Sequence, residues 1–343
     1  MITKILLSPF ALIYGTIATI RNKCFDCGIL YSKKYNKPVI CVGNITVGGT
    51  GKTPHIEYLV TLLAKHNKVA VVSRGYGRKT KGFVVVEPQS PATDVGDEPL
   101  QIKRKFPSAI VAVDEKRVHG IDTLDALHNP DIFLLDDAFQ HRHVDAGMNI
   151  VLVDYNRPLF TDMMLPAGRL REPKSNIVRA NIVIVTKCPP HLTIDEQKAF
   201  ANRLKLTTKQ QIYFTTFRYT KLQPLFDSQP IENIHGVQIV VATGISQPQR
   251  MYNYLESNGA TLHKVEFADH HFFNYNDIEK IKSTYNDIQA KPKIVVITEK
   301  DAARLNTSML DALSEHPIYT LPIEVEFLSN PTDFNETIYN FAK

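Results

Sequence analysis

The sequence has few of the features that would place it in a specialised class of proteins. Its 343 residues contain four cysteines, and neither an internal repeat nor a low-complexity tract is visible. Cys24 and Cys27 form a C-x-x-C pair, but no second pair or histidine pair follows at the spacing that a structural zinc site requires. We therefore interpret the cysteines as reduced thiols in a cytosolic protein.

Strong charge is also missing. The formal net charge is +5, and no concentrated basic stripe with interleaved aromatic residues is present, which argues against a nucleic-acid partner. The mild excess fits contact with phosphates or with an anionic membrane surface. Hydrophobic residues make up 43% of the chain, an ordinary globular value, and the length favours two domains. No feature implies a protein partner.

The N-terminal segment lacks charge between Lys4 and Arg21, yet this run is short for a membrane-spanning helix and contains Pro9 and Gly15. At helical spacing, one face is apolar and carries Ile2, Leu6, Phe10, Ile13, Ile17 and Ile20. The other face carries Lys4, Ser8, Ala11, Gly15, Thr19 and Asn22. We predict that residues 1–22 form an amphipathic helix lying in a membrane interface. A helix packed on its own domain and a signal or anchor segment are the alternatives.

Apolar, β-branched runs recur along the chain, with helical patterns between several of them. They lie at residues 39–42, 69–73, 83–86, 109–113, 132–135, 150–153 and 182–185. Most are continuous rather than alternating, which is typical of strands in a parallel sheet covered on both faces by helices. We predict a doubly wound α/β domain over residues 23–220, a polar strand pair or linker over 212–225, and a smaller α/β domain over 221–343. A helix expected at 332–342 packs on either domain.

The segment after the first of these runs has the composition of a phosphate-binding loop. It comprises Thr46, Val47, Gly48, Gly49, Thr50, Gly51, Lys52 and Thr53. Such a loop needs glycines for close backbone approach to phosphates, a lysine for the β and γ phosphates, and a hydroxyl for magnesium at the start of a helix. The usual pattern has glycine where Thr46 stands, so we expect the phosphate cradle to begin near Gly48. The loop predicts binding of a nucleoside triphosphate with Mg²⁺.

Other strand ends carry candidate groups for phosphoryl transfer. The strand at 132–135 ends in Asp136 and Asp137, which places carboxylates beside the magnesium of the loop. Three further segments offer arginines or acids: residues 73–78 (SRGYGR), 96–99 (GDEP) and 165–173 (LPAGRLREP), which include Asp97, Glu98, Arg169 and Arg171. Histidines at 140–143 and 269–271 lie in different predicted domains, which argues against a zinc site. His270, beside Asp269, is a candidate acid or base.

Taken in order, these motifs resemble tetraacyldisaccharide 4′-kinases, the kinases of the lipid A pathway. The resemblance rests on residues 42–54, 73–78, 96–99, 135–141, 166–172, 267–270 and 298–301, and covers nearly the whole chain. It implies transfer of phosphate from ATP, with Mg²⁺, to the 4′-hydroxyl of a tetraacylated glucosamine disaccharide 1-phosphate, which gives lipid IVA. It also implies a peripheral protein on the cytoplasmic face of a Gram-negative inner membrane, and two α/β domains that close over the nucleotide.

The resemblance also implies roles for individual residues. Lys52 and Thr53 match the phosphate and magnesium residues of the family, and Asp136 and Asp137 match its metal-side acids. Asp97 matches a proposed general base with Glu98 beside it, and His270 matches a histidine that tunes this base. Ala138 stands where the family usually has glycine.

Two other classes remain open. One is a nucleotide-dependent switch or metallochaperone, although Thr186-Lys187-Cys188-Pro189 lacks the Asn and Asp of a guanine-reading element. The other is a membrane-binding ATPase without a small acceptor.

Overall fold

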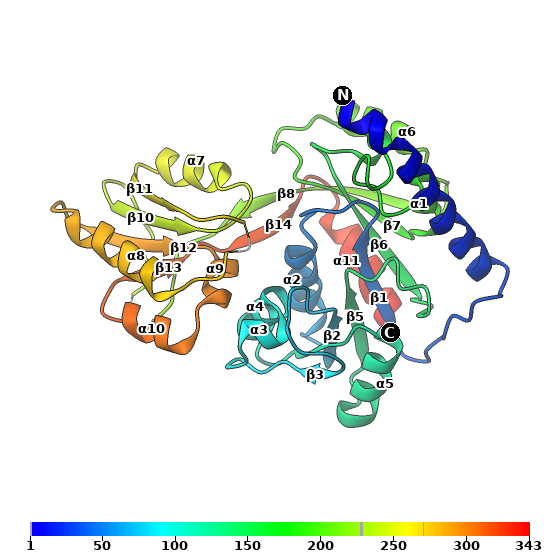
Figure 1. Ribbon diagram of the computed structural model, residues 1–343, viewed down its shortest axis with the longest axis horizontal. Coiled ribbons are helices and arrows are strands. Elements are labelled where there is room, and N and C mark those ends of the chain that lie inside the picture. The colour runs from blue at the N-terminus through cyan, green and yellow to red at the C-terminus, as the bar shows by residue number, and fades with distance from the viewer. Residues whose placement is uncertain (1, 227–228, 270) are drawn as a thin grey trace.

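The computed structural model describes residues 2–226, 229–269 and 271–343, and no side chain before Leu6 is described. The chain builds two sheets that lie side by side and are joined through the strands β8 and β14 (Figure 1). The expected α/β class, with a large and a smaller sheet, is confirmed. The domain boundary at residue 220 stays a prediction.

The larger sheet has the order β14-β8-β7-β6-β1-β5-β2-β4-β3. Its strands are β1 Val39–Asn44, β2 Val69–Ser73, β3 Val84–Val85, β4 Ile110–Val113, β5 Ile132–Asp136, β6 Met148–Asp154, β7 Ile182–Thr186, β8 Gln211–Tyr219 and β14 Ile323–Phe327. All neighbours are parallel except the edge pairs β3–β4 and β14–β8. β1, between β5 and β6, is buried along its whole length because helices cover both faces of the sheet.

The helices of this part are α1 Ile2–Asp26, α2 Lys52–Leu63, α3 Ala92–Val95, α4 Asp97–Lys105, α5 Arg117–His128, α6 Ile194–Leu204 and α11 Pro331–Ala342, with short 3₁₀ turns at Leu159–Thr161 and Lys174–Arg179. One core contains the buried residues of α2 and α4 together with Phe334 and Ile338 of α11. The C-terminal helix therefore packs on the larger sheet. The opposite core includes buried residues of α5 and α6.

The smaller sheet has the order β11-β10-β12-β13-β9. Its strands are β9 Gln223–Pro224, β10 Gln238–Thr243, β11 Thr261–Glu266, β12 Lys293–Ile297 and β13 Ile318–Thr320, and its helices are α7 Gln249–Ser257, α8 Tyr275–Asp287, α9 Glu299–Arg304 and α10 Thr307–Leu313. Only β9 runs antiparallel to its neighbour. Of the two expectations for residues 212–225, the strand pair is wrong, because β8 pairs with β14 and β9 lies in the other sheet; the segment instead leads from the larger sheet to the smaller one.

Helix α1 lies along the outer edge of the part of the chain that is built around the larger sheet (Figure 1). The predicted apolar face is exposed at Leu6, Phe10, Ile13, Ile17 and Ile20, while Ala11 and Asn22 of the opposite face are buried. The helix is thus docked through small and polar residues and, near its end, through the buried Phe25, and it presents the large apolar side chains of its predicted apolar face outward. Within the described part of the chain, no helix is long and apolar enough to cross a membrane.

Candidate active site

The phosphate-binding loop lies where the topology favours a ligand. It follows the carboxyl end of β1, which lies between the parallel strands β5 and β6, and it leads directly into α2. Gly48 and Gly51 have φ angles of 110° and 88°, a region that favours glycine. A Cβ atom on Gly51 would lie 2.4 Å from the Phe217 ring, so the loop also needs glycine there for space.

Side chains at the ends of β1 and β7 form hydrogen bonds with the loop. Asn44 donates a hydrogen bond of 2.8 Å to the hydroxyl of Thr50, and the Thr186 hydroxyl donates one of 2.9 Å to the Thr50 carbonyl. Lys187, which forms an ion pair of 2.8 Å with Asp154, also donates to the Gly49 carbonyl. These contacts fix the loop backbone before any nucleotide binds.

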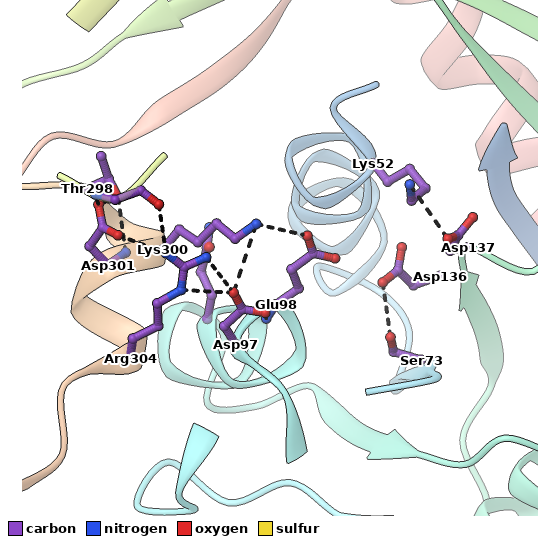
Figure 2. A network of polar contacts seen from close by, with 12 residues as sticks. Lys52, Ser73, Asp97, Glu98, Asp136, Asp137, Thr298, Lys300, Asp301 and Arg304 are labelled. Atoms are coloured by element: carbon purple, nitrogen blue, oxygen red, sulfur yellow. Dashed lines mark hydrogen bonds and ion pairs between the residues drawn. The ribbon is translucent and has the colours of Figure 1, made fainter. Parts of the chain in front are cut away.

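The acidic residues predicted at the metal side lie next to the loop lysine (Figure 2). The Lys52 ammonium is 3.7 Å from Asp137, whose carboxylate is also 2.7 Å from the Arg171 guanidinium. Burial would raise the pKa of Asp137, but the charges of Lys52 and Arg171 outweigh it and the pKa lies below its usual value. Asp137 is therefore ionised at neutral pH.

Asp136 has a different environment from its neighbour. It is almost fully buried, and its Oδ2 accepts a hydrogen bond of 3.1 Å from Ser73. Burial first, and then the charge of Glu98, raise the pKa of Asp136 to about 7. Its Oδ1 is buried and finds no hydrogen-bond partner among the described residues. A cation beside this oxygen would satisfy it and would relieve the repulsion from Glu98, so the donors present fit Mg²⁺.

The described residues contain no group of three or more histidine, cysteine or acidic side chains arranged to bind a metal by themselves. Magnesium in phosphoryl-transfer sites needs no such group, because it takes most ligands from phosphates and water and few from protein. The hydroxyl of Thr53 and the carboxylate of Asp136 are of the expected kind.

The two predicted arginines are placed differently. Arg171 reaches the site: it contacts Asp137 and also donates to the Asn44 side chain. Arg169 is exposed, and its carbonyl accepts a hydrogen bond of 2.8 Å from the Val47 N–H. An isolated bridge between Thr46 and Leu170 lies beside it. The segment around Arg169 thus supports the start of the loop through its backbone.

Asp97 is the first residue of α4 and faces the second sheet (Figure 2). Its Oδ2 is 2.8 Å from Nη2 and 3.1 Å from Nε of Arg304, and its Oδ1 accepts a hydrogen bond of 3.0 Å from the Glu98 N–H. Lys300 lies 3.9 Å from Asp97 and 3.4 Å from Glu98. The predicted base is therefore held by two cations of α9.

The histidines of the two predicted clusters lie in different surroundings. His270 lies outside the described residues. His271 shares a hydrogen bond of 2.8 Å with Asp277 of α8 and stacks on Phe267, which follows β11. Its contacts are therefore with the part of the chain built around the smaller sheet. Burial, and then the charges of Arg117 and Arg74, lower the pKa of His141 to about 4. His141 is consequently neutral.

A cleft of about 280 Å³ opens between the loop and the second sheet. Its wall on one side contains Lys52, Thr53, Phe217 and Tyr219, and the other side is formed by residues of the loops and helices that follow strands of the smaller sheet. The latter residues are Ile245, Ser246, Gln247, Arg250, Met251, Thr298, Glu299 and Lys300. The cleft therefore begins at the phosphate loop and is closed by apolar and polar side chains from both parts.

Comparisons with known proteins agree with this geometry. The model of the family described as LpxK, tetraacyldisaccharide-1-P 4′-kinase, matches residues 3–343. A tetraacyldisaccharide 4′-kinase of Bacteroides thetaiotaomicron is 45% identical, over 98% of this chain and 93% of the relative. That of Flavobacterium johnsoniae is 41% identical, over 98% and 97%. The crystal structure of the "apo" form of LpxK from Aquifex aeolicus in complex with ATP matches with a TM-score of 0.78 and 28% identity over all of both chains.

The chain belongs to the tetraacyldisaccharide 4′-kinase family. The expected family, kinase activity and role in lipid A biosynthesis are thereby confirmed. The residue roles within the site stay predictions.

Several residues that shape this kinase site were not found from the sequence. Arg304 and Lys300 contact the predicted base, and Lys187 supports the loop. Residues 298–301 form part of a family motif, whereas the segment around Lys187 has no pattern that indicates a contact with the loop. Arg304 carried no signal at all, since its partner Asp97 is far away in the sequence.

His55, in the first turn of α2, is expected to make the folding stability of the kinase depend on pH. Its ring lies 2.8 Å from the Gly51 carbonyl and 3.3 Å from the Thr215 hydroxyl, and burial lowers its pKa to about 4. The folded state therefore favours neutral His55, and this contribution is present above pH 6.5 and is lost as the pH falls toward 4. We expect up to about 3 kcal/mol of unfolding free energy to depend on it.

The measurement compares wild type with His55→Gln, which keeps polar atoms but does not titrate. Denaturant unfolding at several pH values should show the wild type losing stability relative to the variant between pH 6.5 and 4. The difference removes the contribution of other groups that titrate in this range. A constant difference would show that His55 is not held neutral by burial.

Proposed function

We propose that this chain transfers the γ-phosphoryl group of ATP to the 4′-hydroxyl of a tetraacyldisaccharide 1-phosphate at a membrane surface. The observation that carries the proposal is the line of Lys52, Asp136 and Asp137 on one side of α2, with Asp97 and Glu98 on the other (Figure 2). Binding of ATP to a relative with the same fold supports the choice of donor.

In this proposal the loop holds the phosphates and Lys52 contacts the transferred group. Thr53 and Asp136 would hold Mg²⁺, which would supply positive charge against the phosphates. Arg171 fixes Asp137 beside Lys52 and adds positive charge near the same place. Asp97, which directly precedes the cleft residue Glu98, accepts the proton of the acceptor hydroxyl.

The acceptor approaches from the side of α1. The Tyr14 hydroxyl at the centre of this helix donates a hydrogen bond of 3.1 Å to the carbonyl of Arg171, and Asn22 donates one of 3.3 Å to Glu172. Helix α1 is thus connected directly to the segment that contacts Asp137. These contacts support delivery of the lipid by α1 to the side of the site on which Arg171 and Asp137 lie.

The test is transfer of labelled phosphate from ATP-Mg²⁺ to the purified tetraacyl disaccharide 1-phosphate. We expect the label on the disaccharide, with no transfer when Mg²⁺ is chelated. Hydrolysis of ATP that the lipid does not stimulate would contradict the proposal and would favour a membrane-binding ATPase. Binding of GTP in preference to ATP would favour a nucleotide-dependent switch.

Membrane attachment through α1 is tested separately. Replacing both Ile13 and Ile17, which are 59% and 61% exposed, by glutamate should lower binding to anionic lipid vesicles at least about tenfold, because apolar burial is lost and negative charge is added. ATP affinity and thermal stability should not change. The measurement is co-sedimentation with vesicles.

A matched control adds the same charge elsewhere. Leu127 on α5 and Tyr275 on α8 are exposed to a similar degree, 63% and 57%, and both are changed to glutamate. This variant should bind vesicles like the wild type. Equal loss of binding in both variants would mean that net charge, and not the face of α1, determines attachment.

A further inference from the structure

A second group of charged side chains lies away from the phosphates, where α2, α4 and α9 meet. The Lys105 ammonium, at the end of α4, is 2.8 Å from Glu57 of α2 and 3.0 Å from Glu299 of α9. Gln101, one turn earlier on α4, donates a hydrogen bond of 2.7 Å to the other oxygen of Glu57. One lysine therefore joins the helix of the phosphate loop to the first helix after β12 in the second sheet.

This junction is built from one buried and two partly buried charges. The side chain of Glu57 is 5% exposed, and those of Glu299 and Lys105 are 16% and 27% exposed. A single ammonium serves two carboxylates, and burial, opposed by Lys105 and reinforced by Glu299, raises the pKa of Glu57 to about 7. Such a group is costly to bury, so it favours one arrangement of its partners over others.

The same two helices, α4 and α9, meet again at their other ends. Arg304, the last residue of α9, contacts Asp97, the first residue of α4, and Lys300 lies between Asp97 and Glu98. Arg304 is itself fixed by Asp301 at 3.0 Å and by the Gly244 carbonyl at 3.0 Å. Helix α4 is thus attached at both ends to α9, which follows β12 of the smaller sheet.

We infer that Lys105 is a positioning residue for phosphoryl transfer: it holds α4, and with it Asp97, between the helix of the phosphate loop and α9 of the second sheet. The inference rests on the proposed role of Asp97. Lys105 lies about 12 Å along the helix from Asp97, so it acts through α4 and touches no reacting atom. Glu57 binds Lys105 to α2, beside the larger sheet, and Glu299 binds it to α9, beside the smaller sheet.

The inference predicts separate effects for the two anchors. Glu299→Gln removes the charge that Lys105 meets across the interface but leaves Lys105 on Glu57, and we expect kcat to fall about tenfold with ATP affinity within about threefold of wild type. Lys105→Met should lower kcat at least as much and also lower thermal stability, because Glu57 loses its buried partner. Lys105→Arg should recover most of kcat.

A double variant tests whether Lys105 acts by positioning α4 or only by neutralising the charge of Glu57. Glu57→Gln combined with Lys105→Met removes both charges of this pair and leaves no buried carboxylate unpaired, so thermal stability should return toward wild type. If Lys105 only neutralised Glu57, kcat would recover too. We expect kcat to stay low, because the contact with Glu299 is still missing.

Lys103→Met is the matched control on the same helix. Its ammonium donates to the carbonyls of Pro107 and Ala109, within the first part of the chain, and it should leave kcat unchanged. Wild-type kcat in both Glu299→Gln and the double variant would overturn the inference.

Hydrogen–deuterium exchange gives a readout that needs no lipid acceptor. The backbone amides of α4 and α9 should exchange faster in Lys105→Met and in Glu299→Gln than in wild type or Lys103→Met. Unchanged exchange in both helices would also overturn the inference. If wild type transfers no phosphate to the disaccharide, the proposed function fails, while the exchange data still decide whether Lys105 holds the helices together.

Discussion

Replacing Lys52 by alanine is expected to lower kcat by roughly 10²–10³-fold or more without unfolding the protein. The Lys52 side chain is only 13% exposed and points toward Asp137 at the end of β5. In the proposed reaction its charge stabilises the transferring phosphoryl group, and a neutral methyl group cannot replace it. ATP affinity should fall less than kcat, because the backbone of the loop still binds the phosphates.

Two measurements check this expectation. Single-turnover transfer to the lipid acceptor reports the chemical step, and thermal unfolding reports the fold. Lys65→Ala, an exposed lysine shortly after the end of α2, is the control and should behave like wild type. A near-normal rate in Lys52→Ala would refute the assignment of residues 46–53 as the loop that acts on the γ-phosphate.

The larger sheet was predictable because its strands are continuous apolar runs. A strand that is buried on both faces leaves a signal within its own four to seven residues, and each expected run overlaps a strand of the structure. The phosphate loop was predictable for a similar reason, since glycines, lysine and threonine follow one another directly. Local patterns therefore give the sheet, the loop and the acids at the end of β5.

Contacts between distant segments left no such signal. β14 pairs with β8 although the whole second sheet lies between them in the sequence, and Arg304 meets Asp97 across the two parts. Nor does periodicity tell which face of α1 is buried: the apolar face is exposed, and small residues such as Ala11 are covered. These features depend on the tertiary packing of helices and strands that are distant in the sequence.

The second large effect is expected at Asp97. Changing it to asparagine should lower kcat by roughly 10²–10³-fold, because the amide cannot accept the proton of the acceptor hydroxyl. Asparagine keeps the size of the side chain, and its oxygen still accepts hydrogen bonds from Arg304 or the Glu98 N–H. The affinity for ATP should therefore stay within about threefold of wild type, which equilibrium binding measures without the acceptor.

Asp94→Asn is the matched control, because Asp94 lies on the short helix α3 just before α4 and its carboxylate accepts a hydrogen bond of 3.1 Å from Thr93. The comparison decides between two mechanisms. Phosphoryl transfer through a loose transition state needs little proton removal before the new bond forms, and position and charge then supply most of the rate. If Asp97→Asn kept kcat within about threefold of wild type, Asp97 would serve only to hold Arg304. A large fall in kcat with intact ATP binding would instead assign it the proton.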